Sequence, residues 1–313
     1  MSVPLLLGTL GESLTERSGH LNLGVEGLML MGAVTGFIVS VKTGSLLLAV
    51  LAGMAGAGFG SLIYAVLTVT LRTRQDVTGL ALTIFGTGFA NTLGKSWSGL
   101  NTPESIRRFA QATPLSPDLS AVQHVPVLGP FLTVMDTAFL RHNWFVYSAF
   151  LLAAFLTVYL FKTRQGLHLR CVGENPSAAD ASGISVTAYR YGHIILGGML
   201  CGLGGVYISV INVGSWLDDI IAGRGWIVVA LVIFIRWHPL KAMAGSLLFG
   251  ALEIIGFRLQ QIPELAGLPF FNQYIIDLYP YLMTILVLIF TYARKKAWQG
   301  PKSLGLSYFR EER

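Results

Sequence analysis

Apolar residues are grouped in long blocks along this chain, and short polar stretches separate the blocks. A helix needs about 20 predominantly apolar residues to cross the core of a bilayer. Four uncharged runs meet or approach that length: residues 43–71, 77–94, 144–161 and 191–217. Five weaker candidates are shorter or carry an acidic residue: residues 3–14, 21–41, 225–235, 242–257 and 275–293. We therefore expect an all-α polytopic membrane protein, a single domain over residues 1–313, with eight or nine transmembrane or re-entrant helices.

Composition supports this class. Hydrophobic residues make up 53% of the chain, and charged residues only 12%. An ordinary soluble domain carries about 25% charged residues, so most of this surface does not face water. The two cysteines, Cys171 and Cys201, fall in a polar loop and in an apolar run, a spacing that suggests neither a disulfide nor a metal site.

Lys and Arg residues predict the orientation of the helices. Alternation through the nine segments puts fifteen of the 22 basic residues on one side, in loops that include residues 72–74, 162–190, 236–241 and 294–313. The positive-inside rule makes that side cytoplasmic. The net charge of +6 is then explained by inner loops and does not indicate nucleic-acid binding.

The loop of residues 162–190 contains a short helix of its own. Asn175 is a good N-cap, Pro176 suits the first helical position, and Gly183 suits a left-handed stop. A helix of about two turns is unstable in isolation. We expect it to dock, either on the membrane part or on a partner protein.

Two glycine-rich runs have the GxxxG spacing, Gly56 with Gly60 and Gly198 with Gly202. Small residues allow helix backbones to approach closely in lipid. The runs are read either as static packing or as helices that slide during gating.

A polar, glycine-containing stretch, residues 16–27, interrupts the expected second helix and includes Glu26. Backbone of this kind is tolerated at membrane depth only inside protein or beside a cavity. Glu26 therefore either lines a cavity or hydrogen-bonds a neighbouring helix. Residues 223–226 have the same character in the second half of the chain, and paired interrupted segments are typical of a substrate pathway.

Four separated motifs carry a family resemblance. They are ERSGHLNLGVEGLMLMGA at residues 16–33, VGENPSAADASGI at 172–184, GGMLCGLGGVY at 197–207 and GRGWIVVALVIFIRWHP at 223–239. The chain resembles inner-membrane permeases of the ABC importer family that includes ribose and branched-chain amino acid permeases. Within that family it is most similar to the shorter permease subunit of the nucleoside and simple-sugar uptake branch, although the segment before ERSG is abbreviated.

The resemblance implies a location in a bacterial-type cytoplasmic (inner) membrane and a role for the short helix. It would be a coupling helix on the cytoplasmic side, transmitting ATP-driven movement from a separate ATPase subunit that binds ATP and Mg. The residues expected at that contact are Glu174, Asn175, Pro176, Ala178, Ala179, Asp180, Gly183 and Ile184. Glu174 also has a simpler interpretation, which is complementation of the helix dipole. Further implied partners are a second permease subunit and an extracellular or periplasmic substrate-binding protein.

The residues do not indicate an enzyme. The chain has no G-x-x-x-x-G-K-[ST] phosphate cradle, and its six histidines show no metal-ligand spacing. No cofactor is therefore expected in this chain. An ion-coupled secondary transporter remains the alternative from another class, with Glu26 and Glu253 as intramembrane carboxylates.

The cargo and its contacts are predicted from the resemblance and from polar groups near the ends of apolar runs. Nucleosides, or related sugar-like solutes, are the expected cargo; simple sugars or branched-chain amino acids are the alternative. The candidate pathway residues are Asn22, Glu26, Thr83, Asn91, Asn212 and Trp216. Each also has a structural interpretation as a cap, an interhelical bond or an interfacial residue. The outer loop, residues 95–143 with a moderately apolar portion at 122–139, either docks a binding protein or caps the bundle.

Overall fold

The computed structural model describes residues 2–115, 136, 141–260, 275, 278–293 and 300–309. Every apolar segment expected from the sequence is helical there, which confirms the all-α class. The corresponding helices are α1 (Ser2–Arg17), α2 (Val25–Thr43), α3 (Leu46–Ala65), α4 (Gln75–Gly94), α7 (Trp144–Lys162), α10 (Val186–Val206), α11 (Arg224–Ile235), α12 (Pro239–Gln260) and α14 (Tyr279–Ala293).

Four helical stretches of the described residues are long and apolar enough to cross a membrane. They are Val25–Thr43, Leu46–Thr70, Trp144–Lys162 and Val186–Val213. Two of them are lengthened by π-helical turns, since α3 continues into η1 (Val66–Thr70) and α10 into η4 (Tyr207–Val213). The chain is thus a multi-pass membrane protein, and the total of eight or nine spans stays a prediction.

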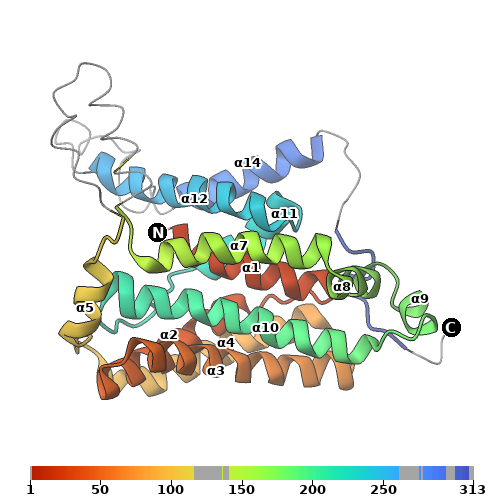
Figure 1. Cartoon of the computed structure of the whole chain (residues 1–313), viewed down its shortest axis with the longest axis horizontal. Coiled ribbons are helices and arrows are strands. Elements are labelled where there is room, and N and C mark those ends of the chain that lie inside the picture. The colour runs from red at the N-terminus through yellow and green to blue at the C-terminus, as the bar shows by residue number, and fades with distance from the viewer. Residues whose placement is uncertain are drawn as a thin grey trace.

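The helices run between two ends of the molecule (Figure 1). One end, which we call the basic end, holds α8 (Arg164–Glu174), α9 (Pro176–Ala181) and the C-terminal residues. The opposite end holds α5 (Glu104–Gln111), where Ser105 donates a hydrogen bond to the carbonyl of Gly44 at 3.2 Å. At the basic end, Leu21 N–H donates to Gln75 Oε1 at 2.8 Å. The loops that helix alternation assigns to the same side of the membrane therefore do lie at the same end of the molecule.

Helix α1 lies at the centre of the bundle. All residues of Val3–Glu16 are buried, although the sequence marks this segment as short and weak. It packs against α10, where Gly11 and Gly197 leave no room for a Cβ atom on either helix. This N-terminal helix is therefore a core element.

The GxxxG glycines bring α2, α3 and α10 into backbone contact. A Cβ atom on Gly202 would come within 2.9 Å of the Gly53 carbonyl, and one on Gly32 would collide with Gly202. This arrangement supports the packing interpretation of the two glycine runs.

The outer loop caps the bundle in the part that the structure describes. Thr102 N–H donates to the Gly214 carbonyl at 2.9 Å, and isolated bridges join Ser98 to Trp216 and Asn101 to Ser215. The apolar portion expected at 122–139 lies outside the described residues except for Asp136.

Candidate functional site

Helix α9 has the local structure that its sequence predicts. The side-chain oxygen of Asn175 accepts the Ala178 N–H at 3.0 Å, and Pro176 is the first helical residue. Gly183 follows the helix with φ of +80°, a left-handed conformation that favours glycine. A six-residue helix is thus closed at both ends by its own sequence.

The inner face of α9 docks on its own chain. Ala179 is 3% exposed and packs against Val172 of α8 and Val186 of α10. Its expected contact with a partner stays a prediction, and in this structure the methyl group faces the chain's own cluster. Ile184 is half-buried against the same cluster, whereas Ala178 is exposed.

The outer face of α9 is open, with two exposed alanines in the helix and exposed polar residues at its two ends. Glu174, Asn175, Ala178, Ala181 and Ser182 are exposed there. A partner at the basic end would therefore meet polar groups and two small methyl groups.

Helix α8, which the sequence reading missed, carries α9 at its end. Thr163 caps it by accepting the Gly166 N–H at 3.0 Å, a signal that the sequence does contain. At its last turn Gly173 packs against the carbonyl of Arg17, with no space for a side chain. The position of α9 is therefore tied to the end of α1.

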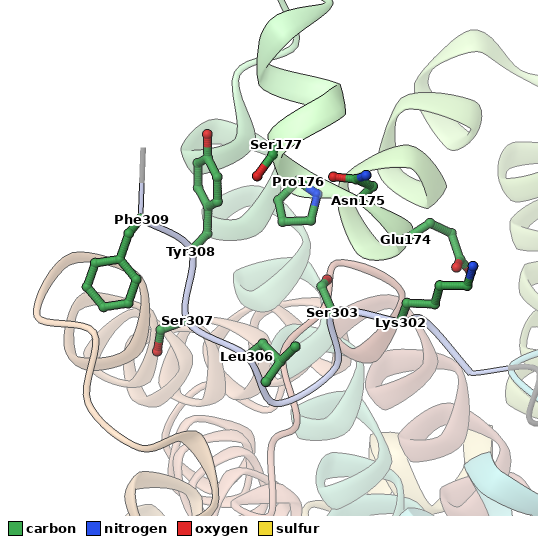
Figure 2. Close-up of a pocket in the computed structure, with 10 residues that line it drawn as sticks. All are labelled: Glu174, Asn175, Pro176, Ser177, Lys302, Ser303, Leu306, Ser307, Tyr308 and Phe309. Carbon is green, nitrogen blue, oxygen red and sulfur yellow. The ribbon is translucent and has the colours of Figure 1, made fainter. Parts of the chain in front are cut away.

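A groove of about 250 Å³ separates α9 from residues 300–309 (Figure 2). Tyr308 donates its hydroxyl hydrogen to Asp180 Oδ2 at 2.9 Å across this region. The lining residues come from both sides: Glu174, Asn175, Pro176, Ser177, Lys302, Ser303, Leu306, Ser307, Tyr308 and Phe309.

Glu26 is bonded to backbone at the start of α11. Its Oε1 accepts the Gly223 N–H at 2.9 Å and its Oε2 accepts the Gly225 N–H at 2.6 Å. The first N–H groups of a helix have no partners within the helix, and the carboxylate satisfies two donors there. The geometry supports the structural alternative for Glu26.

Asn22 and Thr83 hold the polar stretch that precedes α2. Asn22 is buried, and its Oδ1 accepts the Gly24 N–H at 2.8 Å while its own N–H donates to Glu12 at 3.1 Å. Thr83 of α4 donates to the Leu23 carbonyl at 3.0 Å. Both residues therefore shape the backbone next to Glu26.

The other three pathway candidates lie apart from this group. Trp216 is fully buried near the opposite end, with its ring centroid 6.1 Å from that of Phe37. Asn91 is exposed on α4, and Asn212 is exposed in η4. The six candidates thus do not form one cluster.

Sequence reasoning missed a buried acidic contact at the basic end. Glu16 accepts a hydrogen bond from Trp237 Nε1, and Arg17 donates to the Trp237 carbonyl at 3.4 Å. The signal was present, because both residues lie in motifs of the family resemblance. His238 follows Trp237 in the same turn. Burial lowers the pKa of His238, and the positive charges of Lys241 and Arg17 lower it further.

The structure thus defines a helical membrane protein that presents a capped short helix at its basic end. The described residues hold no group of His, Cys, Asp and Glu suited to a metal ion.

Comparison with known proteins identifies the family. Residues 1–291 match the family described as branched-chain amino acid transport system, permease component, and the chain belongs to it. It is a transport subunit and not an enzyme.

Three relatives cover almost the whole chain. It is 35% identical to a putative glucose ABC transporter permease, TsgC13, of Haloferax volcanii, over 98% of this chain and 94% of the relative. It is 34% identical to the guanosine ABC transporter permease NupQ of Bacillus subtilis, over 100% and 95%. It is 33% identical to the nucleoside ABC transporter permease NupC of Lactococcus lactis, over 99% and 95%. No solved structure matches the chain.

Proposed function

We propose that this chain is the membrane-spanning subunit of an ATP-binding-cassette importer that moves nucleosides into the cytoplasm, with α9 as its coupling helix. The observation that carries the coupling role is the capped six-residue helix held on α8, with Ala178, Ala181 and the polar residues at its two ends exposed. A rigid, short element on a tether is suited to pass a partner's movement into the bundle.

The orientation follows from charge. Among the described residues, the basic end collects most of the Lys and Arg residues, and the positive-inside rule places it in the cytoplasm. An ATPase subunit would then reach α9 from that side, and ATP and Mg would bind to the ATPase. A substrate-binding protein would approach the opposite end, near α5, in a bacterial-type cytoplasmic membrane.

A second permease subunit completes the pathway in this proposal. Helix α4 supports it by exposing large apolar side chains, including Val77, Ile84 and Phe85, together with Asn91. The apolar side chains would face lipid or the second subunit. Asn91 would face a pathway that the two subunits share. The nine helices of the described residues that match the apolar segments would cross or enter the membrane, with α11, of 12 residues, as a half-helix.

Two relatives named for guanosine and nucleoside transport support nucleoside cargo. A relative named for glucose transport favours sugars as the second candidate. The ion-coupled alternative is disfavoured because Glu26 is bonded to two backbone N–H groups and Glu253 pairs with Arg224.

Uptake of radiolabelled solutes tests the proposal. The chain is reconstituted in vesicles with its ATPase, second permease and binding protein, and guanosine, adenosine, uridine, ribose and glucose are offered with and without ATP. ATP-dependent nucleoside uptake is expected. Uptake of glucose or ribose alone would move the cargo to sugars, and uptake driven by a proton or sodium gradient without ATP would overturn the importer.

A further inference from the structure

Residues 300–309, which we call the C-terminal strap, contain no regular helix but are fixed by contacts at the basic end. Gly300, Pro301 and Ser303 are buried. Ser303 donates from both its backbone N–H and its hydroxyl to the Gly173 carbonyl, at 3.0 and 2.7 Å. The strap is therefore anchored to the last turn of α8.

The strap also contacts the turn that follows α1. Gly19, with φ of +90°, approaches Ser303 so closely that a Cβ atom would collide with the Ser303 hydroxyl. Only glycine adopts this conformation readily and leaves the space. Ser303 thus touches the ends of two helices at once.

Further along the strap, Tyr308 reaches α9. Its hydroxyl donates to Asp180 at 2.9 Å, and its ring packs on the cluster that buries Ala179. The guanidinium of Arg190, on α10, lies 6.0 Å from the ring centroid. The strap therefore joins α9 by a side-chain bond that is independent of the α8 tether.

Residues on either side of Tyr308 reach α4 and the turn before it. Gln75 donates to the Leu306 carbonyl at 3.4 Å and accepts from Leu21 N–H at 2.8 Å. The Phe309 ring lies 4.6 Å from the guanidinium carbon of Arg72. One continuous segment thus links α9 to the start of α4 and to the polar stretch before α2.

We propose that the C-terminal strap is a second transmission route, in which Tyr308 is a positioning residue that passes displacement of α9 to α4 and to residues 19–21. The proposal rests on the coupling role given to α9. Helix α9 is otherwise joined to the bundle by the chain at Asn175 and Gly183 and by the packing of Ala179 on α8 and α10. The Tyr308–Asp180 bond adds a link to a different set of helices.

The test uses the reconstituted importer and measures solute taken up per ATP hydrolysed. Tyr308→Phe removes the hydroxyl and keeps the ring; Asp180→Ala removes the acceptor, and Asp180→Asn keeps an acceptor oxygen. Tyr191→Phe is the matched control, because that hydroxyl, at the same end, bonds Thr70 and not the strap.

We expect Tyr308→Phe to lower uptake per ATP by about fivefold or more, since it removes the hydrogen bond to the Asp180 carboxylate. Asp180→Ala removes that acceptor together with its other contacts, so it should lower the ratio at least as much. Tyr191→Phe should stay near the parent, and Asp180→Asn should fall between the parent and Asp180→Ala because it keeps one acceptor oxygen but not the charge. The double variant Tyr308→Phe/Asp180→Ala should lose no more than Asp180→Ala alone. Subunit assembly, followed by co-purification, should be unchanged in all.

An unchanged ratio of uptake to ATP hydrolysis in Tyr308→Phe overturns the strap proposal. Loss of assembly in Tyr308→Phe and Asp180→Ala also overturns it, because the bond would then be a structural anchor. Absence of ATP-dependent uptake by the parent importer would instead refute the proposed function. The two failures are thus distinguishable.

Discussion

Replacement of Glu26 is the sharpest test of how the half-helix α11 is held. The carboxylate accepts two backbone N–H groups, from Gly223 and Gly225, and is only 6% exposed. Hydrogen bonds to charged groups contribute about 1.5–3 kcal/mol each, so Glu26→Ala should cost about 3–6 kcal/mol. Glu26→Gln keeps one acceptor oxygen and turns an NH₂ group toward the other donor, so about half of that loss is expected.

The assay is thermal unfolding of the detergent-solubilised complex, with uptake measured in parallel. Glu104→Gln is the control, since it also removes a carboxylate, but from an ion pair whose side chains are more than 70% exposed. Exposed pairs contribute little, so its Tm should be unchanged.

A different ranking would refute the capping argument. If Glu26→Gln keeps the parent Tm but loses uptake, the side chain acts on the cargo and not on α11. If Glu26→Ala is as stable as the control, the two backbone bonds do not stabilise the bundle.

Three further outcomes are expected. Ala178→Arg should abolish ATP-dependent uptake with normal membrane insertion, because Ala178 is exposed on α9. Ala179→Arg should also disrupt the packing of α9 itself. Normal uptake by both variants would contradict the coupling role. In a Cys171→Ser background, Ala181→Cys should react with an impermeant thiol reagent only from the cytoplasm and Glu104→Cys only from outside, and the reverse pattern would invert the topology. Gly32→Ala should prevent stable assembly because its methyl group would meet Gly202, whereas Gly88→Ala, with nothing within 4 Å, should be neutral or gain up to about 1 kcal/mol of helix stability; equal stability of the two would refute close packing at Gly32.

Apolar blocks predicted the helices well, because length and hydropathy are local properties. The burial of α1 could not be predicted in the same way. Its 16 residues contain two glutamates, and only its close packing against α10 shows that it is a core helix. Asn175, Pro176 and Gly183 specified α9 because capping is a local interaction.

Contacts between distant segments could not be read from the sequence. Glu26 was open to two interpretations until Gly223 and Gly225 were found beside it, 197 and 199 residues further along the chain. The C-terminal strap has no periodicity, so nothing local indicated that Tyr308 would bond Asp180. Family motifs marked the segments of Glu26, Asp180 and Gly223 without indicating what each of them contacts.

Residues 16–27 and 223–226, the two polar, glycine-containing stretches of similar character, meet at helix α11. Helix α11 is fixed at its start by Glu26 and just beyond its end by Glu16 and Arg17, which bond Trp237. Arg236 and Trp237 both have positive φ, of 56° and 55°, a conformation that costs energy in residues with side chains. Contacts from the first polar stretch offset that cost. A half-helix held at both ends by one neighbouring segment should move with that segment as a unit, so displacement at the basic end would reach residues 223–225 without a hinge within α11.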